Sequence, residues 1–258
     1  MQPTPLKVFI TGASSGLGAA LARHYAGRAA VLGLAARRGE VLEKLAAELP
    51  VSCFLYPLDV SDASALALAG ADFIARAGVP DIVIANAGIS FGTLTEEVAD
   101  LPAIALVMGV NVLGMAHTLH PFVTAMKQVG RGRLVGICSV AGIRGMPGAG
   151  AYCASKAATI AYLESLRVEL RGSGVSVATI VPGYIATPMT AGNRYPMPFM
   201  LSAAEAARRI VRHIEGGTSY AVVPWQMAIV AKILRLLPNG LFDRLFARAG
   251  RKSRRLPL

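Results

Sequence analysis

A tyrosine and a lysine four residues apart are the first residues in this sequence that could carry chemistry. Of the seven tyrosines, only Tyr152 is followed at that spacing by a lysine, Lys156. Residues i and i+4 share one face of a helix, and a cation beside a phenol lowers the pKa of the phenol from about 10. We therefore predict that Tyr152 donates or accepts a proton near neutral pH. An accidental surface pair is the alternative.

A serine thirteen residues before Tyr152 ends an apolar run, GRLVGICS, at Ser139. Ligands of open α/β sheets bind beyond the carboxyl ends of the strands. Ser139 is therefore predicted to hydrogen-bond a carbonyl oxygen of a ligand. The alternative is a turn cap, which is the ordinary role of a serine at the end of a strand.

The run TGASSGLG, residues 11–18, joins the first strand-like run to a helix-length segment. Glycine allows the backbone to turn sharply and to approach a ligand closely, and Gly12, Gly16 and Gly18 supply that freedom. A helix that starts at such a turn directs its free N–H groups and its positive dipole end toward the ligand. This arrangement predicts a dinucleotide pyrophosphate site, with a tight turn that binds nothing as the alternative.

Two adjacent arginines follow the second strand-like run, in AARRGE. A NAD site places an acidic residue there to bind both ribose hydroxyls, but this sequence has Ala36, Arg37 and Arg38, and its next acid is Glu40. Guanidinium groups bind phosphate bidentately, whereas a carboxylate repels it. We therefore predict that NADP(H) is preferred over NAD(H). Solvated arginines beside a permissive NAD site are the alternative.

The elements that position these residues follow from the alternation of apolar runs and helix-length segments. Strand-like runs occupy residues 6–11, 29–35, 51–56, 81–85, 132–139, 175–183 and 220–224. Repeated βα units predict a parallel sheet with helices on both faces. We expect an α/β protein with a single-domain Rossmann fold, a doubly wound parallel sheet of about seven strands, over residues 1–223. Residues 224–258 form a basic amphipathic C-terminal extension.

The extension carries much of the net charge of +11. Its basic residues are Lys232, Arg235, Arg244, Arg248, Arg251, Lys252, Arg254 and Arg255, against one acid, Asp243. Two apolar stripes accompany them: Ile229, Ile233, Leu236 and Leu237, then Leu241, Leu245 and Phe246. Such a segment could bind an anionic membrane interface, pack on a partner subunit, or dock on its own domain with a solvated basic end. No nucleic-acid partner is expected, because the sequence contains no motif of a nucleic-acid-binding fold.

The composition, 54% apolar and 16% charged, is that of a globular chain. Cys53, Cys138 and Cys153 cannot form a paired framework, which predicts a reduced, cytoplasmic protein, at the inner face of the membrane if the extension binds lipid. We expect no signal peptide and no apolar stretch of the 18 or so residues that a membrane-spanning helix needs. No metal site is expected, since no acid or cysteine completes a set with His117 and His120.

Taken together and in order, these motifs resemble those of the short-chain dehydrogenase/reductase family over residues 6 to about 223. The resemblance rests on TGASSGLG, NAG at residues 86–88, Asn111 in GVNVLG, Ser139, YCASK and PGYIAT at residues 182–187. One departure is Ala85, where the family often has a first asparagine before NAG. It predicts a slightly altered turn without loss of activity.

The resemblance implies roles for individual residues. Tyr152 is the general acid/base, Lys156 lowers its pKa and holds the nicotinamide ribose, and Ser139 binds the substrate carbonyl. Asn111 kinks its helix and holds a water that relays protons from Lys156. With the two arginines, the predicted cofactor-binding residues are Gly12, Ser14, Ser15, Gly16, Leu17, Gly18, Arg37, Arg38, Asp59, Val60, Asn86, Ala87, Gly88, Tyr152, Lys156, Pro182, Gly183, Ile185 and Thr187. In that set Asp59 contacts the adenine, and Thr187 with the Ile185 backbone holds the nicotinamide carboxamide.

The segment after Thr187, PMTAGNRYPMPFML, corresponds to the lid over the substrate in that family. Its methionines and aromatic residues offer an adaptable apolar surface, with ordinary core packing as the alternative. The predicted substrate-binding residues are Ser139, Ile143, Met146, Tyr152, Tyr184 and Met189. We expect an apolar ketone or aldehyde, of a lipid- or steroid-like kind, reduced with NADPH in a reaction that also runs in reverse as an alcohol dehydrogenase. The family also implies a homodimer or homotetramer. The competing class is a cofactor-binding membrane or interaction protein whose extension carries the function.

Overall fold

The computed structural model describes residues 6–193, 195–247, 249–250, 252 and 254. Its main sheet has seven parallel strands in the order β3-β2-β1-β4-β5-β6-β9. The strands are β1 (Leu6–Thr11), β2 (Ala29–Ala36), β3 (Ser52–Pro57), β4 (Ile82–Ala85), β5 (Gly132–Ile137), β6 (Val175–Pro182) and β9 (Tyr220–Val223). The predicted single-domain Rossmann fold with a seven-stranded parallel sheet is confirmed.

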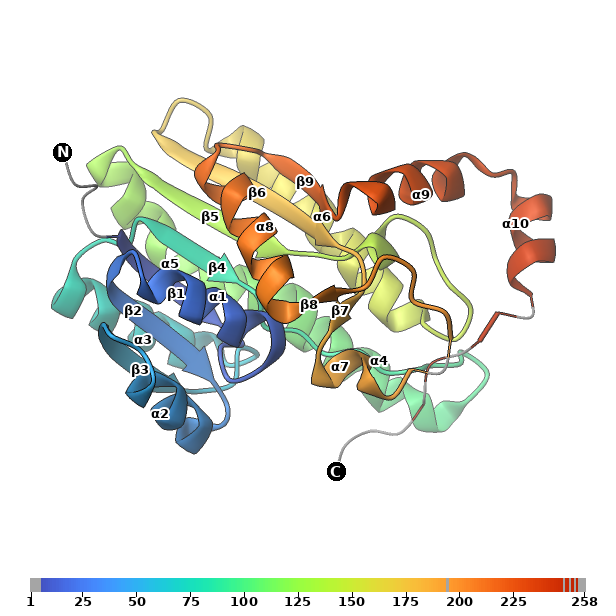
Figure 1. Ribbon diagram of the computed structural model, residues 1–258, viewed down its shortest axis with the longest axis horizontal. Helices are drawn as coiled ribbons and strands as arrows, with labels where there is room; N and C mark the ends of the chain where they lie inside the picture. The colour runs from blue at the N-terminus through green and yellow to red at the C-terminus, as the bar shows by residue number, and fades with distance from the viewer. Residues whose placement is uncertain (1–5, 194, 248, 251, 253, 255–258) are drawn as a thin grey trace.

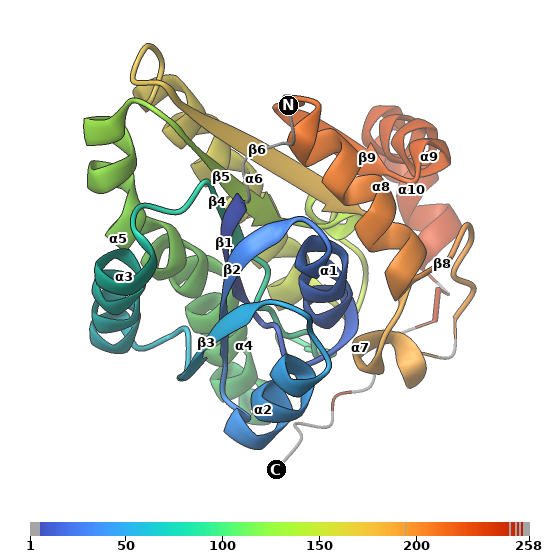
Figure 2. The same cartoon turned by 60° about the vertical axis from the view of Figure 1, so that its left-hand side comes forward.

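Helices cover both faces of this sheet (Figure 1). Figure 2 shows α1 (Gly16–Ala26), α2 (Gly39–Ala47) and α8 (Ala203–Glu215) on one side, and α3 (Ala63–Ala77) and α5 (Gly114–Val129) on the other. The second layer also contains α4 (Leu101–Met108) and α6 (Gly150–Glu169). A sheet buried on both faces explains why its strands are almost continuously apolar.

The first strand, β1, contributes side chains to the hydrophobic cores on both faces of the sheet. Successive side chains of a strand point to opposite faces of the sheet. Val8 and Ile10 accordingly belong to the core beneath α1, α2 and α8, whereas Phe9 belongs to the core beneath α3, α5 and α6. The Phe9 ring packs against Phe73 and Phe122, with ring centroids 5.5 Å and 4.9 Å away.

The strand order reverses beside β1, because β2 and β3 lie on one side of it and β4, β5, β6 and β9 on the other. The connections after β1 and β4 therefore leave toward opposite faces of the sheet. This divergence opens a crevice at the carboxyl ends of the central strands, where open α/β sheets bind ligands.

One helical segment overturns an expectation. The residues Val98–Val129 form a 32-residue helical segment in which an 18-residue window has a mean hydropathy of 1.8, so that the segment is long and apolar enough to cross a membrane. The expectation that no stretch reaches that length was wrong, because Asn111 and the histidines interrupt the apolar run without adding formal charge. Length and composition alone do not separate a spanning helix from a core helix. This segment contributes Leu119 and Phe122 to the buried core.

The C-terminal extension docks on its own domain. Its first helix, α9 (Trp225–Leu236), follows β9 and buries Met227 and Ala231. Arg144 donates to the carbonyl oxygen of Leu237 at 2.6 Å, and its guanidinium lies 3.9 Å from the ring centroid of Phe242 in α10 (Asn239–Phe246). Leu237, predicted within the first apolar stripe, is the C-cap residue that follows α9. Arg248, Arg251 and Arg255 of the basic cluster lie outside the described residues.

Candidate active site

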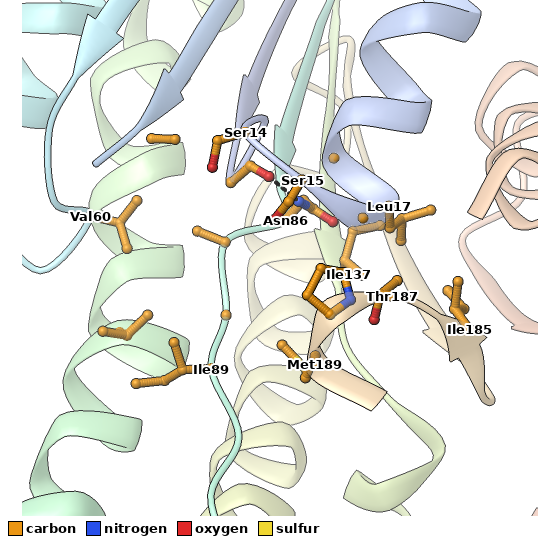
Figure 3. Close-up of a pocket in the computed structure, with 18 of the residues that line it drawn as sticks. Ser14, Ser15, Leu17, Val60, Asn86, Ile89, Ile137, Ile185, Thr187 and Met189 are labelled. Carbon is orange, nitrogen blue, oxygen red and sulfur yellow. Dashed lines mark hydrogen bonds between the residues drawn. The ribbon is translucent and has the colours of Figure 1, made fainter. Parts of the chain in front are cut away.

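A cleft of about 430 Å³ lies at the carboxyl edge of the sheet. All the residues predicted to bind a cofactor line it, as do Ser139 and Met189. In Figure 3, Thr187 and Met189 lie on one side of the cleft and Val60 and Ile89 on the other. Sequence reasoning missed the further lining residues Leu58, Ile89, Val110, Ile137, Cys138, Pro188 and Thr190. Most of them adjoin a recognised motif, which is the signal that could have found them.

The glycine turn has the geometry of a phosphate cradle. Gly12 and Gly16 have φ angles of 67° and 55°, which strain residues that carry a Cβ. A Cβ on Gly18 would lie 2.1 Å from the carbonyl oxygen of Gly12. The backbone from Ser14 to Gly18 lines the cleft at the N-terminus of α1, where N–H groups have no partner within the helix. The cradle therefore fits the pyrophosphate of a dinucleotide.

Asn86 connects the turns that follow β1 and β4. Its side-chain amide donates to the carbonyl oxygens of Thr11 at 3.0 Å and Gly12 at 3.3 Å. Ala85, the departure from the family pattern, is the last residue of β4 and is 2% exposed in the core. The link between the two turns is thus made by Asn86, so it does not require a polar side chain at position 85.

The two arginines lie at the rim of the cleft, close to the glycine turn. Arg38 donates to the hydroxyl of Ser14 at 3.0 Å. The side chain of Arg37 is 68% exposed and approaches the carboxylate of Asp59 to 3.9 Å. Burial raises the pKa of Asp59, but hydrogen bonds from Ser61 and the charge of Arg37 outweigh this effect and lower it. Asp59 is therefore ionised at neutral pH and carries the negative charge that faces Arg37.

Tyr152 on α6 and Ser139 at the end of β5 meet within the cleft. Ser139 starts a short 3₁₀ turn, Val140–Gly142, and its hydroxyl accepts the N–H of Ala141 at 3.2 Å. Ser139 is thus the turn cap that the alternative interpretation required. Hydrogen bonding with the same hydroxyl also acts to lower the pKa of Tyr152. One serine therefore holds its turn and faces the tyrosine.

The pKa of Tyr152 shifts in the direction opposite to the one that the spacing to Lys156 predicts. Burial raises the pKa of Tyr152 to about 12, which outweighs the hydrogen bonding with Ser139. The ammonium of Lys156 lies 5.9 Å from the Tyr152 ring centroid and donates to the carbonyl oxygen of Ile137 at 2.9 Å. Burial lowers the pKa of this lysine as well, because the charged form loses hydration. Tyr152 is therefore protonated at neutral pH and able to donate a proton.

Asn111 lies behind the cleft, and is fully buried in a π-helical turn, Gly109–Leu113, between α4 and α5. Its carbonyl oxygen accepts the N–H of Ile89 at 2.8 Å, and its amide donates to the Ile89 carbonyl at 3.0 Å and to the Ser155 hydroxyl at 2.9 Å. Asn111 thus joins the kinked helix to the loop after β4 and to α6. Its role in a proton relay stays a prediction.

The predicted substrate residues divide into two groups. Met189 lines the cleft, whereas Ile143, Met146 and Tyr184 lie outside its lining. Tyr184 instead packs near Tyr195 of the lid, with ring centroids 6.4 Å apart. The sequence could not show this division, because it depends on where the lid crosses the opening.

The end of the chain reaches the active site, which sequence reasoning missed. The ammonium of Lys252 lies 5.8 Å from the Tyr152 ring centroid and donates to the hydroxyl of Ser90 at 2.8 Å. Arg254 forms ion pairs with Glu97 and Asp100. Lys252 is therefore partly buried, whereas Arg254 is exposed, as a solvated basic end predicts, and is also held by two carboxylates. No local pattern could have located them, since their partners lie more than 150 residues earlier.

Comparison with known proteins settles the family. The model of the short chain dehydrogenase family matches residues 7–197. The chain belongs to the short-chain dehydrogenase/reductase family. This chain is similar to an uncharacterised oxidoreductase of Myxococcus xanthus, with 39% identity over 237 residues that cover 91% of this chain and 93% of the relative.

Solved structures agree with this assignment. A short chain dehydrogenase from Burkholderia cenocepacia in complex with NADP has a TM-score of 0.82 and 27% identity, covering 95% of this chain and 99% of that one. A short chain dehydrogenase/reductase from Burkholderia phymatum in complex with NAD also has a TM-score of 0.82, at 23% identity over 100% of this chain and 99% of that one, which supports the fold alone. The protein is an NAD(P)-dependent oxidoreductase of this family that acts on a small molecule.

Proposed function

We propose that this oxidoreductase uses NADPH to reduce the carbonyl group of an apolar ketone or aldehyde, and that it also runs in reverse as an alcohol dehydrogenase. The observation that carries the proposal is that Tyr152, protonated at neutral pH, and Ser139 both lie in the cleft that the dinucleotide-binding motifs line. The nicotinamide, when bound, supplies the hydride. The residues of the chain supply position and the proton.

Each residue of the site has a distinct part in the proposed reduction. The Ser139 hydroxyl donates to the substrate carbonyl oxygen and fixes its position, and Tyr152 gives that oxygen its proton. Lys156 lies between the Ile137 carbonyl and Gly88, whose Cβ, if it had one, would be 3.6 Å from the ammonium. From there the ammonium can bind ribose hydroxyls beside Tyr152. Asn111 is a positioning residue, because its three hydrogen bonds hold the Ile89 loop and α6 together.

The test of the proposed reaction is Tyr152→Phe. Loss of a general acid lowers kcat by about 10²- to 10⁴-fold, whereas the dissociation constant of NADPH, measured by fluorescence titration, should stay nearly unchanged. Tyr162→Phe is the matched control, because Tyr162 lies on the same helix with its side chain toward solvent. A panel of apolar ketones and aldehydes, followed by NADPH absorbance, identifies the substrate. Normal turnover by Tyr152→Phe would refute the mechanism.

The preference for NADPH is supported by the arginines at the rim. Arg38 is already held beside the glycine turn by Ser14, and Arg37 is exposed enough to turn toward a 2′-phosphate. No acidic residue follows β2 directly in the sequence before Glu40, so the position at which a NAD site places its carboxylate is the uncharged Ala36. Asp59 remains available for the adenine, as the family resemblance implies.

The apolar character of the substrate is supported by the side chains around the opening. Met189 lines the cleft, and Tyr184 packs with Tyr195 close to Cys153 on the catalytic helix. Phe199 and Met200 of the lid are exposed. Methionine and aromatic side chains adapt to flexible apolar ligands, which favours a lipid-like compound.

A second role is favoured by the surface of the extension. The helices α9 and α10 expose a row of apolar side chains, with Trp225 at 65% and Leu236 at 81%. The other exposed members are Ile229, Ile233, Leu241 and Leu245. Exposed Lys232 and Arg235 accompany them on α9. We propose that this surface binds an anionic membrane interface and holds the cytoplasmic enzyme at the inner face of the membrane.

Flotation with vesicles of phosphatidylcholine and phosphatidylserine tests the membrane contact. Point variants are needed, because deletion of residues 226–258 also removes Lys252 from the active site. Leu236→Glu should abolish flotation with the anionic vesicles. The matched control is Leu68→Glu on α3, where Leu68 is 73% exposed. Equal flotation of both variants and the native protein would refute this contact.

Self-association is supported by a second exposed apolar surface, on α4, the π-helical turn and α6. Leu106, Leu113 and Val168 are exposed there. We propose a homodimer or homotetramer through these helices. Light scattering coupled to size-exclusion chromatography should show a smaller species for Leu113→Glu, and an unchanged mass would refute this interface.

A further inference from the structure

Two ammonium groups lie beside the catalytic tyrosine, and the reaction proposed above uses only one of them. Lys156 lies 5.9 Å from the Tyr152 ring centroid and Lys252 lies 5.8 Å from it. Lys156 belongs to the same helix as Tyr152, whereas Lys252 comes from the end of the chain. The hydrogen bond from Lys252 to Ser90 places it on the loop that follows the NAG motif.

Arg254 anchors the chain end in this position. Its guanidinium donates to Asp100 at 2.9 Å and to Glu97 at 3.1 Å. Asp100 is buried and also accepts the N–H of Leu94 at 2.8 Å, so its carboxylate is fixed before Arg254 binds. The backbone at Gly250 lies close to the lid, because a Cβ on Gly250 would be 3.0 Å from the Cβ of Tyr195. The chain end thus docks on both sides of Lys252.

Lys252 itself has no carboxylate partner in the described part of the chain. All 15 Asp and Glu residues lie in that part, and the ion pairs of the chain end go to Arg254. An ammonium has three hydrogens to donate, and the Ser90 hydroxyl takes one of them. Burial lowers the pKa of Lys252 to about 8, which is the direction expected of a cation that lacks compensation. Lys252 is partly buried, and a partly buried cation without a carboxylate partner beside a reactive group is typical of a binding site.

We propose that Lys252 binds an anionic group of the substrate, so that the enzyme selects a carbonyl compound that carries a carboxylate or phosphate close to the reacting C=O and an apolar remainder. The proposal rests on the proposed carbonyl reduction. The Ser139 and Tyr152 hydroxyls hydrogen-bond the carbonyl oxygen, and the Lys252 ammonium binds the anion. The apolar lid contacts the rest of the molecule. Arg254 is a positioning residue, since it holds the chain that carries Lys252.

The first experiment measures binding and does not depend on turnover. Calorimetric titration of the NADP⁺-loaded protein with octanoate and with octanamide compares an anion with a neutral molecule of the same shape. We expect octanoate to bind more tightly, and Lys252→Met to weaken it by about tenfold or more, because hydrogen bonds to charged groups are the strong ones. Lys252→Arg should retain most of the affinity. Lys127→Met is the matched control, since Lys127 is exposed in the last turn of α5 and does not line the cleft.

The second experiment measures specificity in turnover and identifies the anion. The 2-, 3- and 4-oxooctanoates are compared with their methyl esters, and hydroxyacetone phosphate with hydroxyacetone. For each pair, kcat/KM of the anionic compound is divided by kcat/KM of its neutral partner. We expect Lys252→Met to lower this ratio by about tenfold or more. The pair with the larger ratio in the native enzyme, carboxylate or phosphate, identifies the anion. Arg254→Met should lower the same ratio.

The outcomes separate this proposal from the proposed reaction. Octanoate binding that depends on Lys252, with no reduction of any carbonyl compound, would support the anion site and refute carbonyl reduction. Reduction of the methyl esters as efficiently as the acids, with the same ratio in Lys252→Met, would refute the anion site and leave the reductase intact. If Lys252→Met changed only the pH profile of ester reduction, the anion site would also be refuted, because Lys252 would then act on Tyr152 and not on the substrate.

Discussion

The preference for NADPH can be tested most sharply at the two arginines that follow β2. Arg38 starts α2 without using its side chain as a cap and donates to Ser14 instead. Aspartate is a better N-cap than arginine, so Arg38→Asp should leave the helix stable while it places a carboxylate beside the expected phosphate. Arg37 faces Asp59 across 3.9 Å at an exposed site, and such pairs contribute at most about 1 kcal/mol. Arg37 can therefore leave Asp59 for a phosphate at little cost.

The magnitude follows from the number of charge-assisted contacts. A hydrogen bond to a charged group contributes about 1.5–3 kcal/mol, which corresponds to roughly 10- to 160-fold in kcat/KM. We expect the native enzyme to prefer NADPH over NADH by about 100-fold or more. Either Arg37→Ser or Arg38→Asp should lower this preference by about tenfold or more, and the double variant should reverse it. Arg37→Ser is chosen because Arg37→Asp would set a carboxylate against Asp59.

Steady-state kinetics with both cofactors and one carbonyl substrate supply the measurement. Arg131→Asp is the matched control, because Arg131 is exposed just before β5, at the amino edge of the sheet, and should leave the ratio unchanged. Equal efficiency of the native enzyme with NADH and NADPH would refute the assignment of the arginines. A preference for NADPH that survives the double variant would refute it as well.

Three further outcomes follow from the site. Gly18→Ala should lower Tm by about 2–12 °C and weaken NADPH binding, since the added Cβ would lie 2.1 Å from the Gly12 carbonyl oxygen; Gly240→Ala, which meets no atom within 4 Å, is the control in thermal scans. Asn111→Ala should destabilise the fold by about 1–3 kcal/mol in urea titration, because buried partners lose their hydrogen bonds; an unchanged midpoint would contradict this. Alcohol oxidation should speed up as pH rises from 7 to 10, since burial raises the pKa of Tyr152 to about 12 and only the phenolate acts as a base. A pH profile of oxidation that is flat over this range would show that Tyr152 is not the base.

The sequence predicted those parts of the fold that depend on short-range pattern. The alternation of Val8, Phe9 and Ile10 indicates a strand between two cores, and the structure places the three side chains as that period requires. The glycine turn was predicted for the same reason, because steric freedom at Gly12 and clearance at Gly18 are properties of single residues. The membrane-length helix at Val98–Val129 was missed, since polar uncharged residues hide the length of an apolar segment.

Properties that depend on burial could not be predicted from spacing. The four-residue interval between Tyr152 and Lys156 places both on one helix face, as expected, yet it does not reveal how much water surrounds them. Burial raises one pKa and lowers the other, so the effect of the environment exceeds the attraction that the spacing suggests. Ser139 illustrates the same limit, because the structure shows it as the turn cap, while its predicted hydrogen bond to a ligand carbonyl stays a prediction.

By itself the sequence determined the Rossmann architecture and the glycine turn, and it pointed to Tyr152 and Ser139 as the predicted catalytic residues and to the arginines that follow β2. These features are encoded in contiguous residues whose period, steric size and charge act locally. The tertiary structure alone decided that Arg38 meets Ser14, that Asn111 supports the Ile89 loop, and that Lys252 lies beside Tyr152. Such contacts depend on the path of the whole chain, since Lys252 and Ser90 are 162 residues apart and meet only after α9 and α10 have docked.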